Sequence, residues 1–337
     1  MKSFVIVFQA VLTVDAWNPL AHDVVARLAA VRLTEKGKEF VGGALRVPVN
    51  QVTENMALES VWADLNQNLV PGSGAWHFAG GSDGLELFTE CSHDLGELLC
   101  RLVEQIRKLL SNDPAVRNNA VKFVIHLMAD LHQPLHVGRA SDSDGNVIKI
   151  KLPSALVPVL EKPGANLHSL WDAGLPNFCF LKNKDLVPAT DRVSNGKRVN
   201  FPTLTEHEIV NQLGEILVDE SGEISLLGIS AGTFTDGAAL QSLLTEVATR
   251  SHHLSLEKAY AFKNDLGIRV EMTKGAPAAY ELPMSYLEEN AGLIPRLLAE
   301  AGLQLAEVLN VAASLAEPLA PVEDARARDE DVGFDFR

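Results

Sequence analysis

The feature that most constrains this fold is a repeated histidine–aspartate spacing inside apolar sequence. His126 and Asp130 lie four residues apart, and His168 and Asp172 repeat the spacing. On a helix, residues four apart project from one face. Imidazole and carboxylate groups that face the inside of a helical bundle form a ligand set expected for zinc. A hydrogen bond on a helix surface is the alternative for either pair taken alone.

Apolar residues recur at helical spacing through most of the longer segments. We therefore predict an all-α fold, a single compact helical domain, because the 47% hydrophobic content is enough for one sizeable core. One exception is Val147–Leu152, which alternates apolar and polar residues after a turn signal at Ser143–Asn146 and predicts a small β-hairpin. The predicted helices are Leu20–Thr34, Leu95–Leu110, Ala115–Leu131, Glu206–Val218, Gly237–Phe262 and Met284–Leu315.

The first residues have the pattern of a secretory signal. Lys2 precedes the apolar run Phe4–Val14, and small Ala16 suits a cleavage site. A transmembrane anchor is the alternative, but the run is shorter than the roughly 20 residues that a bilayer requires. We expect a signal peptide at 1–16, the functional domain at 17–316 and a charged tail at 317–337, which can bury little apolar surface. The protein is then secreted, into an extracellular, periplasmic, secretory-pathway or lysosome-like compartment, without a membrane anchor.

Cysteine count and net charge limit the remaining possibilities. With only Cys91, Cys100 and Cys179, one intrachain disulfide at most can form in an oxidising compartment, and Cys91 with Cys100 is the pair that we favour. The formal charge of −15 excludes a protein that grips nucleic acid through a broad basic surface, because no surplus of cations exists to displace counterions. Affinity for phosphate must come from a local site, and bound divalent cations provide one.

Further candidate ligands lie near the two histidine–aspartate pairs or near the N-terminus. Pro134 cannot continue a regular helix, so the chain should turn there and can bring His136 back towards His126. Cleavage after residue 16 would leave Trp17 with a free α-amino group, which can chelate a divalent metal together with its carbonyl oxygen. His22 follows five residues later. The remaining candidates, each beside an aromatic residue, are Asp64 and His77.

Together these segments resemble the zinc-dependent single-strand nuclease family that includes mung bean nuclease and the fungal nucleases called S-one and P-one. The resemblance runs from Trp17 to about Ala316. The segments that carry it are Trp17 with His22, Trp62-Ala63-Asp64, Trp76-His77-Phe78, His126 to Asp130, His132-Gln133-Pro134-Leu135-His136, Asp144-Gly145-Asn146, Asn166-Leu167-His168 to Asp172, and Ala301 to Asn310.

The resemblance implies a hydrolase of phosphoester bonds with three zinc ions per chain. Its substrates would be single-stranded DNA and RNA, cleaved to 5′-nucleotides, and 3′-nucleotides, cleaved to nucleosides. Zinc lowers the pKa of bound water towards about 7, so a zinc-bound water is the nucleophile, oriented by Asp64, and no side chain need attack. The implied ligands are Asp64, His77, His126 and Asp130 for one ion, Trp17, His22 and bridging Asp130 for the second, and His136, His168 and Asp172 for the third.

Substrate recognition departs from the family pattern at two positions. Phe78 occupies the family's base-stacking position, and stacking selects unpaired bases because a duplex hides their π-faces. Many members carry a carboxylate or amide two residues later, where this chain has Gly80; Asp83 is the nearby residue that can take its place. A basic residue commonly follows the first aspartate ligand by three, and here it is Gln67. Base preference and substrate length therefore stay open.

Two other functions remain alternatives, and no protein partner is inferred. A zinc-dependent phospholipase C is similar in fold and ligands, but its last ligand is typically glutamate, whereas Asp172 stands here. A non-catalytic secreted zinc protein would lack ligands, and none is missing. His132 is expected beside a ligand rather than as one. The other histidines, expected at the surface or hydrogen-bonded in the core, are His93, His207, His252 and His253.

Overall fold

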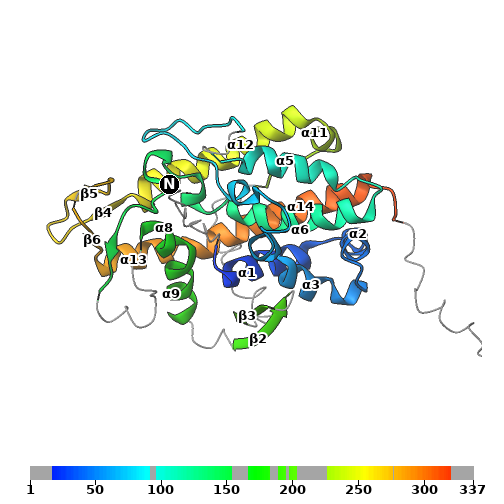
Figure 1. The fold of residues 1–337 in the computed structure, drawn as a ribbon, viewed down its shortest axis with the longest axis horizontal. Helices are drawn as coiled ribbons and strands as arrows, with labels where there is room; N and C mark the ends of the chain where they lie inside the picture. Colours follow the sequence, from blue (N-terminus) through cyan, green and yellow to red (C-terminus); the bar gives the residue numbers. More distant parts are fainter. Residues whose placement is uncertain are drawn as a thin grey trace, which may run out of the picture.

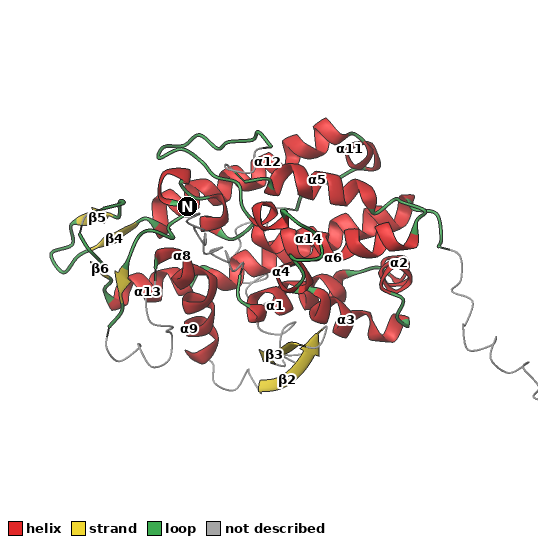
Figure 2. Cartoon of the chain, viewed as in Figure 1, coloured by secondary structure: helices red, strands yellow, loops and turns green. Residues whose placement is uncertain are grey.

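Helices make up most of the computed structural model, which describes residues 17–91, 96–153, 166–182, 189–194, 197–202, 226–275 and 277–319 (Figures 1 and 2). The all-α fold class is therefore confirmed. The expected signal peptide, the helix expected at Glu206–Val218 and the tail beyond Leu319 lie outside the described residues, as do His93 and His207. None of the described helices combines the length and the apolar character that a membrane crossing requires.

Three long helices form the centre of the structure: α1 (Pro19–Arg32), α6 (Pro114–Asp130) and α14 (Ile294–Leu315). Each has proline within its first two positions, where a missing amide costs nothing. The Asn18 side chain caps α1, and the Asp113 side chain caps α6. Since α1 and the second half of α6 are buried on nearly all sides, they lie inside the bundle rather than on its surface.

The other helices surround this centre, with α5, α11 and α12 along the upper edge in Figure 1, α3 beside α1, and α2 against α14 and α6. The α-helices are α2 (Glu35–Leu45), α3 (Val52–Glu59), α4 (Trp62–Leu65), α5 (Leu98–Lys108), α8 (Leu167–Ser169), α9 (Leu175–Lys182), α11 (Ala231–Thr235), α12 (Gly237–Leu254) and α13 (Met284–Ala291). Short 3₁₀ turns are η1 (Val49–Gln51), η2 (Ser73–His77), η3 (Pro134–Val137) and η4 (Ala140–Asp142), and π-helical turns are η5 (Leu170–Gly174) and η7 (Ser255–Ala259).

Two predicted helices are interrupted in the structure. The helix expected over Met284–Leu315 is divided into α13 and α14 at Gly292–Leu293, just before Pro295. The helix expected over Gly237–Phe262 ends at Leu254, and a π-helical turn and a short strand follow. In both cases the apolar residues keep their helical spacing past the point where the helix ends, so periodicity alone could not locate that end.

The strands form three two-stranded pairs. Strands β2 (Ala189–Ser194) and β3 (Lys197–Pro202) are antiparallel, as are β4 (Ala261–Lys263) and β5 (Arg269–Glu271). Strand β1 (Ile150–Lys151) instead pairs in parallel with β6 (Tyr280–Glu281).

The prediction of a hairpin at Val147–Leu152 was therefore wrong. The antiparallel pairs of strands are β2 with β3 and β4 with β5. The residues that precede this segment form the turns η3 and η4 and offer no strand for it to fold back on. Its backbone groups pair with a distant segment instead.

The Cys91–Cys100 disulfide is present, with the two Cα atoms 6.1 Å apart. It joins the loop after η2 to the first turn of α5. The pair favoured on sequence grounds is thus the one that forms.

We predict that Gly302→Val in α14 destabilises the fold by about 1–3 kcal/mol, because a side chain there overpacks the contact between α14 and α1. An ideal Cβ at Gly302 would lie 2.6 Å from Leu28 Cβ and 3.1 Å from the Val25 carbonyl oxygen. Denaturant unfolding would measure the change. Gly43→Ala in α2 is the control, because no atom lies within 4 Å of its Cβ position. Equal stability of the two variants would contradict this packing.

Candidate metal centre

Helix α6 and the turn that follows it supply three of the candidate ligands. His126 and Asp130 lie on one face of the last turns of α6, and both are fully buried. The chain then turns at Pro134, where the Gln133 side chain accepts a hydrogen bond from the Leu135 amide. This turn returns His136 to the centre, with its Nδ1 3.5 Å from Asp130 Oδ1.

Four side chains, from α4, η2 and α6, surround one point (group 1: Asp64, His77, His126 and Asp130). His126 Nε2 lies 3.0 Å from His77 Nδ1, 3.2 Å from Asp130 Oδ2 and 3.5 Å from Asp64 Oδ1. His77 Nδ1 lies 3.0 Å from Asp130 Oδ2 and 3.5 Å from Asp64 Oδ1. Tetrahedral ligands with zinc bonds of 2.0–2.1 Å are separated by about 3.3 Å. These separations therefore fit one tetrahedral ion.

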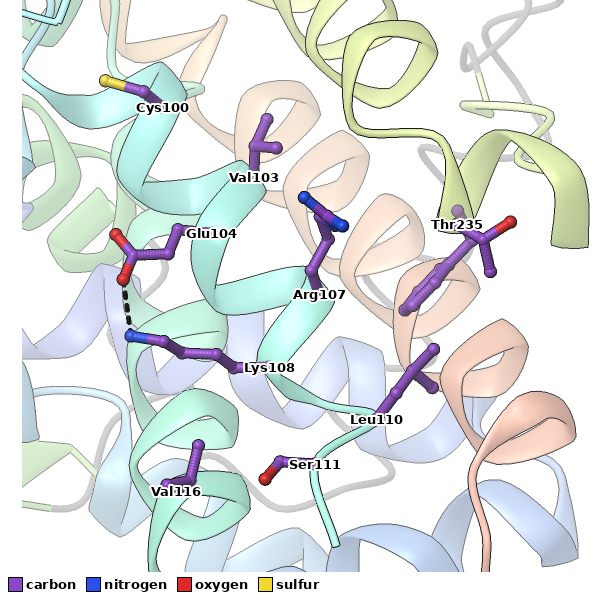
Figure 3. A pocket seen from close by; sticks show the side chains of 10 residues that line it. Cys100, Val103, Glu104, Arg107, Lys108, Leu110, Ser111, Val116 and Thr235 are labelled. Atoms are coloured by element: carbon purple, nitrogen blue, oxygen red, sulfur yellow. Dashed lines mark hydrogen bonds and ion pairs between the residues drawn. The ribbon is translucent and has the colours of Figure 1, made fainter. Parts of the chain in front are cut away.

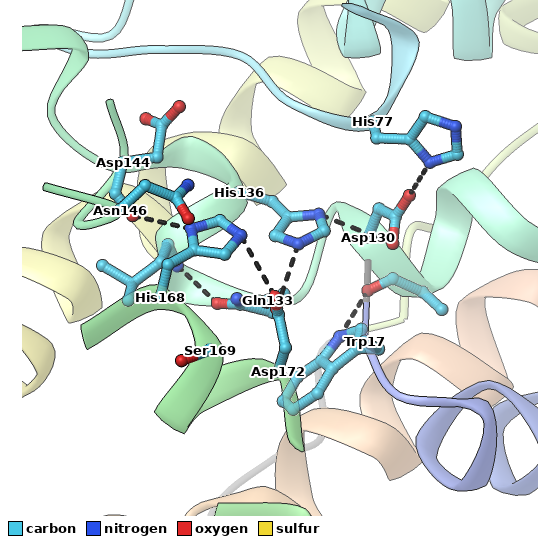
Figure 4. A network of polar contacts seen from close by, with 12 residues as sticks. Trp17, His77, Asp130, Gln133, His136, Asp144, Asn146, His168, Ser169 and Asp172 are labelled. Carbon is cyan, nitrogen blue, oxygen red and sulfur yellow. Dashed lines mark hydrogen bonds and ion pairs between the residues drawn. The ribbon is translucent and has the colours of Figure 1, made fainter. Parts of the chain in front are cut away.

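His22 and Trp17 reach the same carboxylate from the other side (group 2: Trp17, His22 and Asp130). His22 Nε2 lies 3.5 Å from Asp130 Oδ1, and its ring stacks on that of His126 with centroids 4.0 Å apart. The Trp17 indole donates to the Ala129 carbonyl at 3.0 Å, and the next amide, of Asn18, donates to the Asp172 carbonyl at 2.8 Å. The Trp17 backbone is thereby held between the elements that carry the two aspartates, below Asp130 in Figure 4.

The third group consists of His136, His168 and Asp172, which η3, α8 and η5 bring together (group 3; Figure 4). His136 Nε2 lies 3.2 Å from Asp172 Oδ1, and His168 Nε2 lies 3.2 Å from Asp172 Oδ2. Asn166 and Ser169 form a capping box that starts α8 one residue before His168. Because His136 also approaches Asp130, this histidine connects group 3 to the carboxylate that groups 1 and 2 share.

Backbone carbonyls and one amide orient the ligands from outside. His126 Nδ1 donates to the Ser60 carbonyl at 2.6 Å, and His168 Nδ1 donates to the Asp144 carbonyl at 2.7 Å, so each ring presents Nε2 to the centre. The Gln133 amide donates to Asp172 Oδ1 at 2.6 Å. Sequence reasoning missed these roles, since Gln133 and Asp144 stood in the quoted motifs without a function and nothing in the sequence signals a carbonyl such as that of Ser60.

The charges of the buried groups are strongly coupled. Burial alone would raise the pKa of Asp130, but the neighbouring imidazoles of His126 and His136 hold it well below its ordinary value. Burial opposes the charged form of His126 too, yet Asp130 and Asp64 raise its pKa to about 9. A proton on His126 thus balances the buried carboxylate charge, and a divalent cation can replace it.

Several ligand atoms also lack any other partner. Among the described residues, His22 Nε2, His168 Nε2 and Asp130 Oδ1 face their groups without a hydrogen bond. Orphaned buried nitrogens are costly, and metal binding relieves that cost. Three sets of side chains therefore fit divalent ions by distance, donor type and burial: Asp64 with His77 and His126, His22 with His126 and Asp130, and His136 with His168 and Asp172.

The predicted recognition residues lie on the segment that follows η2. Phe78 is half-buried and packs against Gly96, whose φ is +91° and where a Cβ would clash with Phe78. Gly80 is buried. Asp83 is exposed at the end of the loop, and its carboxylate accepts a hydrogen bond from Ser141 rather than from a residue of the metal groups. Gln67, half-buried, lies in the turns after α4.

A separate hollow of about 760 Å³ lies between α5, α11 and the start of α6 (Figure 3). Arg107, Lys108 and Phe234 are among its lining residues, and Lys108 is paired with Glu104. None of the candidate ligands lines it. We therefore assign the hollow no part in the chemistry of the metal groups.

Comparison with known proteins gives a family match. A family model described as S1/P1 Nuclease matches residues 17–314. Endonuclease 2 of Arabidopsis thaliana is 26% identical over 175 residues, which cover 48% of this chain and 57% of that protein. Nuclease S1 of Aspergillus oryzae is 26% identical over 168 residues, 48% of this chain and 54% of that protein. The chain thus spans about half the length of these two curated relatives.

We predict that Asp130→Asn lowers the bound metal more than Asp172→Asn does, because Asp130 belongs to two ligand groups and Asp172 to one. Elemental analysis of the purified variants after dialysis would measure metal per chain. Circular dichroism would show that both remain helical. Equal losses in the two variants would contradict the sharing of Asp130.

Proposed function

This chain belongs to the S1/P1 nuclease family, and we propose that it is a secreted zinc enzyme acting on phosphoester bonds. Its proposed substrates are single-stranded DNA and RNA, hydrolysed to 5′-nucleotides, and 3′-nucleotides, hydrolysed to nucleosides. The observation that carries the proposal is the convergence of His22, His77 and His126 on one carboxylate, that of the buried Asp130. No protein nucleophile is proposed.

The proposed zinc ligands are Asp64, His77, His126 and Asp130 in group 1, the Trp17 amine and carbonyl with His22 and Asp130 in group 2, and His136, His168 and Asp172 in group 3. When bound, zinc supplies a water of lowered pKa and positive charge that stabilises the phosphoryl group and the departing oxygen. Asp130 holds two of the sites at a fixed separation because each of its oxygens faces a different group.

Exposure indicates which side of the centre meets the substrate. The Asp64 side chain is 22% exposed, whereas those of His77, His126 and Asp130 are fully buried. Asp64 is therefore the ligand suited to orient a water towards an arriving phosphate. The buried histidines exclude bulk solvent from the opposite side, which strengthens electrostatic interactions in the centre.

Recognition of an unpaired base is proposed for Phe78, with Asp83 as a second contact. Phe78 directly follows the ligand His77, so a base stacked on its ring would lie within one nucleotide of the centre. The net charge of −15 supports a local mode of binding, in which the metal ions rather than a basic surface attract phosphate.

We predict that the mature protein begins at Trp17, because only a free α-amino group there can join His22 and Asp130 as a ligand. Mass spectrometry of the secreted protein would identify its first residue. A chain that keeps one extra residue before Trp17 should bind less zinc and hydrolyse substrate more slowly. Full activity of that extended chain would remove Trp17 from the ligand set.

We predict that His126→Ala lowers turnover of single-stranded DNA, RNA and 3′-AMP on the order of a hundredfold or more, because it removes one proposed ligand from group 1. His253→Ala is the matched control, since His253 is exposed on α12. Wild-type rates in His126→Ala would overturn the mechanism.

Removal of metal with a mild chelator distinguishes a catalytic role of zinc from a purely structural one. We expect activity to be lost while helicity, measured by circular dichroism, stays high, because the described core extends well beyond the ligands. Loss of both together would favour a structural role. Hydrolysis of a choline phospholipid without hydrolysis of nucleic acid would favour the phospholipase C alternative.

A further inference from the structure

His252 is a fully buried histidine outside the three ligand groups, and both of its ring nitrogens face backbone carbonyl oxygens. It lies near the end of α12, with Nδ1 2.6 Å from the Val137 oxygen and Nε2 2.8 Å from the Gly84 oxygen. Carbonyl oxygens only accept hydrogen bonds, so a bond between the ring and either segment has His252 as its donor. His252 therefore lies within hydrogen-bond distance of two segments that are far apart in the chain.

These two segments are the ligand turn and the recognition loop. Val137 follows the proposed ligand His136, and Gly84 lies at the tip of the loop that begins at Phe78. The base of the loop is joined to the turn by backbone bonds, from the Ala79 amide to the His136 oxygen and from the Gly81 amide to the Gly138 oxygen, each 2.7 Å long.

The tip of the loop depends on fewer contacts. Within the loop, the Ser82 amide donates to the Glu86 oxygen at 2.7 Å. Among the described contacts with the rest of the protein, Ser141 donates to Asp83 at the exposed surface, and His252 donates to Gly84 from the interior. Water competes with the exposed hydroxyl contact of Ser141, and it competes less with the bond from the fully buried His252 ring. His252 is thus the stronger of these two anchors.

Gly81 allows this anchor to form. A Cβ at Gly81 would lie 2.3 Å from His252 Cε1 and 2.7 Å from His252 Nδ1. The imidazole therefore occupies the space that a side chain at position 81 would need, and the loop lies directly on the ring. The glycine in the loop and the histidine on α12 form one fitted contact.

We propose that His252 is a positioning residue for substrate binding, which fixes the loop carrying Phe78 and Asp83 relative to the turn carrying His136. This inference rests on the proposed function, because it assumes that Phe78 stacks on an unpaired base of a single-stranded nucleic acid. His252 itself touches neither metal nor substrate. It restricts the loop so that a base on Phe78 and the adjoining phosphate at the metal centre are held together.

Two substitutions separate the two bonds of His252. In His252→Gln the side-chain amide can take the place of Nε2 and keep the bond to Gly84. In His252→Asn it can take the place of Nδ1, which keeps the bond to Val137 and leaves the Gly84 oxygen without a donor. A residue that only fills the core would respond to both changes alike.

We expect His252→Asn to raise KM for a single-stranded oligonucleotide on the order of tenfold, with kcat and zinc content unchanged, because the loop tip is released. His252→Gln should stay close to the parent. A glutamate-specific protease should cleave the zinc-loaded His252→Asn protein faster at Glu86, and this readout requires no catalysis. His253→Asn and His253→Gln are the matched controls on the same helix, because His253 is exposed.

Unchanged KM and unchanged cleavage at Glu86 in His252→Asn would overturn the inference, and so would equal effects in both His252 variants or a loss of helicity in both. If the parent protein hydrolysed no nucleic acid, the proposed function would fail, while the protease experiment would still decide whether His252 anchors the loop.

Discussion

The burial of Asp130 among imidazoles is the constraint on which the rest of the structure depends. A carboxylate with no solvent exposure is strongly unfavourable unless positive charge surrounds it. His22, His77 and His126 approach it from α1, η2 and α6, and His136 approaches from the turn after α6. These elements can meet only if α1 and α6 pack closely in the bundle. On α1, helix α14 also packs closely, because Gly302 has no side chain at the contact.

The centre has a closed side and an open side, and the proposed chemistry follows from this asymmetry. Carbonyl oxygens of Ser60 and Asp144 fix the rings of His126 and His168 from the closed side. Asp64 is the partly exposed member of group 1, and the segment with Phe78 and Asp83 begins right after the ligand His77. Short chain connections therefore join the proposed metal ligands to the proposed recognition residues, and His252 adds a tertiary connection at the far end of the same loop.

Membership in the nuclease family leaves room for differences in substrate choice. The chain is about one quarter identical to Endonuclease 2 and Nuclease S1 over the matched parts. Gly80 and Gln67 stand where a base-edge contact and a phosphate-binding cation were expected from the family pattern. The net charge of −15 leaves no surplus of basic side chains to bind phosphate, so the proposed recognition depends on the loop geometry and on bound metal ions.

Sequence by itself determined the helical class, the bounds of α1, α5 and α6 to within a few residues, and the chemical type of each candidate ligand, because helical period and four-residue spacing are local properties. It missed α2 and α3 and misplaced the hairpin, since the partner of Ile150–Lys151 lies at Tyr280–Glu281. Only the tertiary structure decided that the Ser60 carbonyl orients His126, that Gln133 holds Asp172, and that His252 anchors Gly84. Such contacts join residues far apart in the chain, and their geometry depends on the packing of whole helices, which no local pattern encodes.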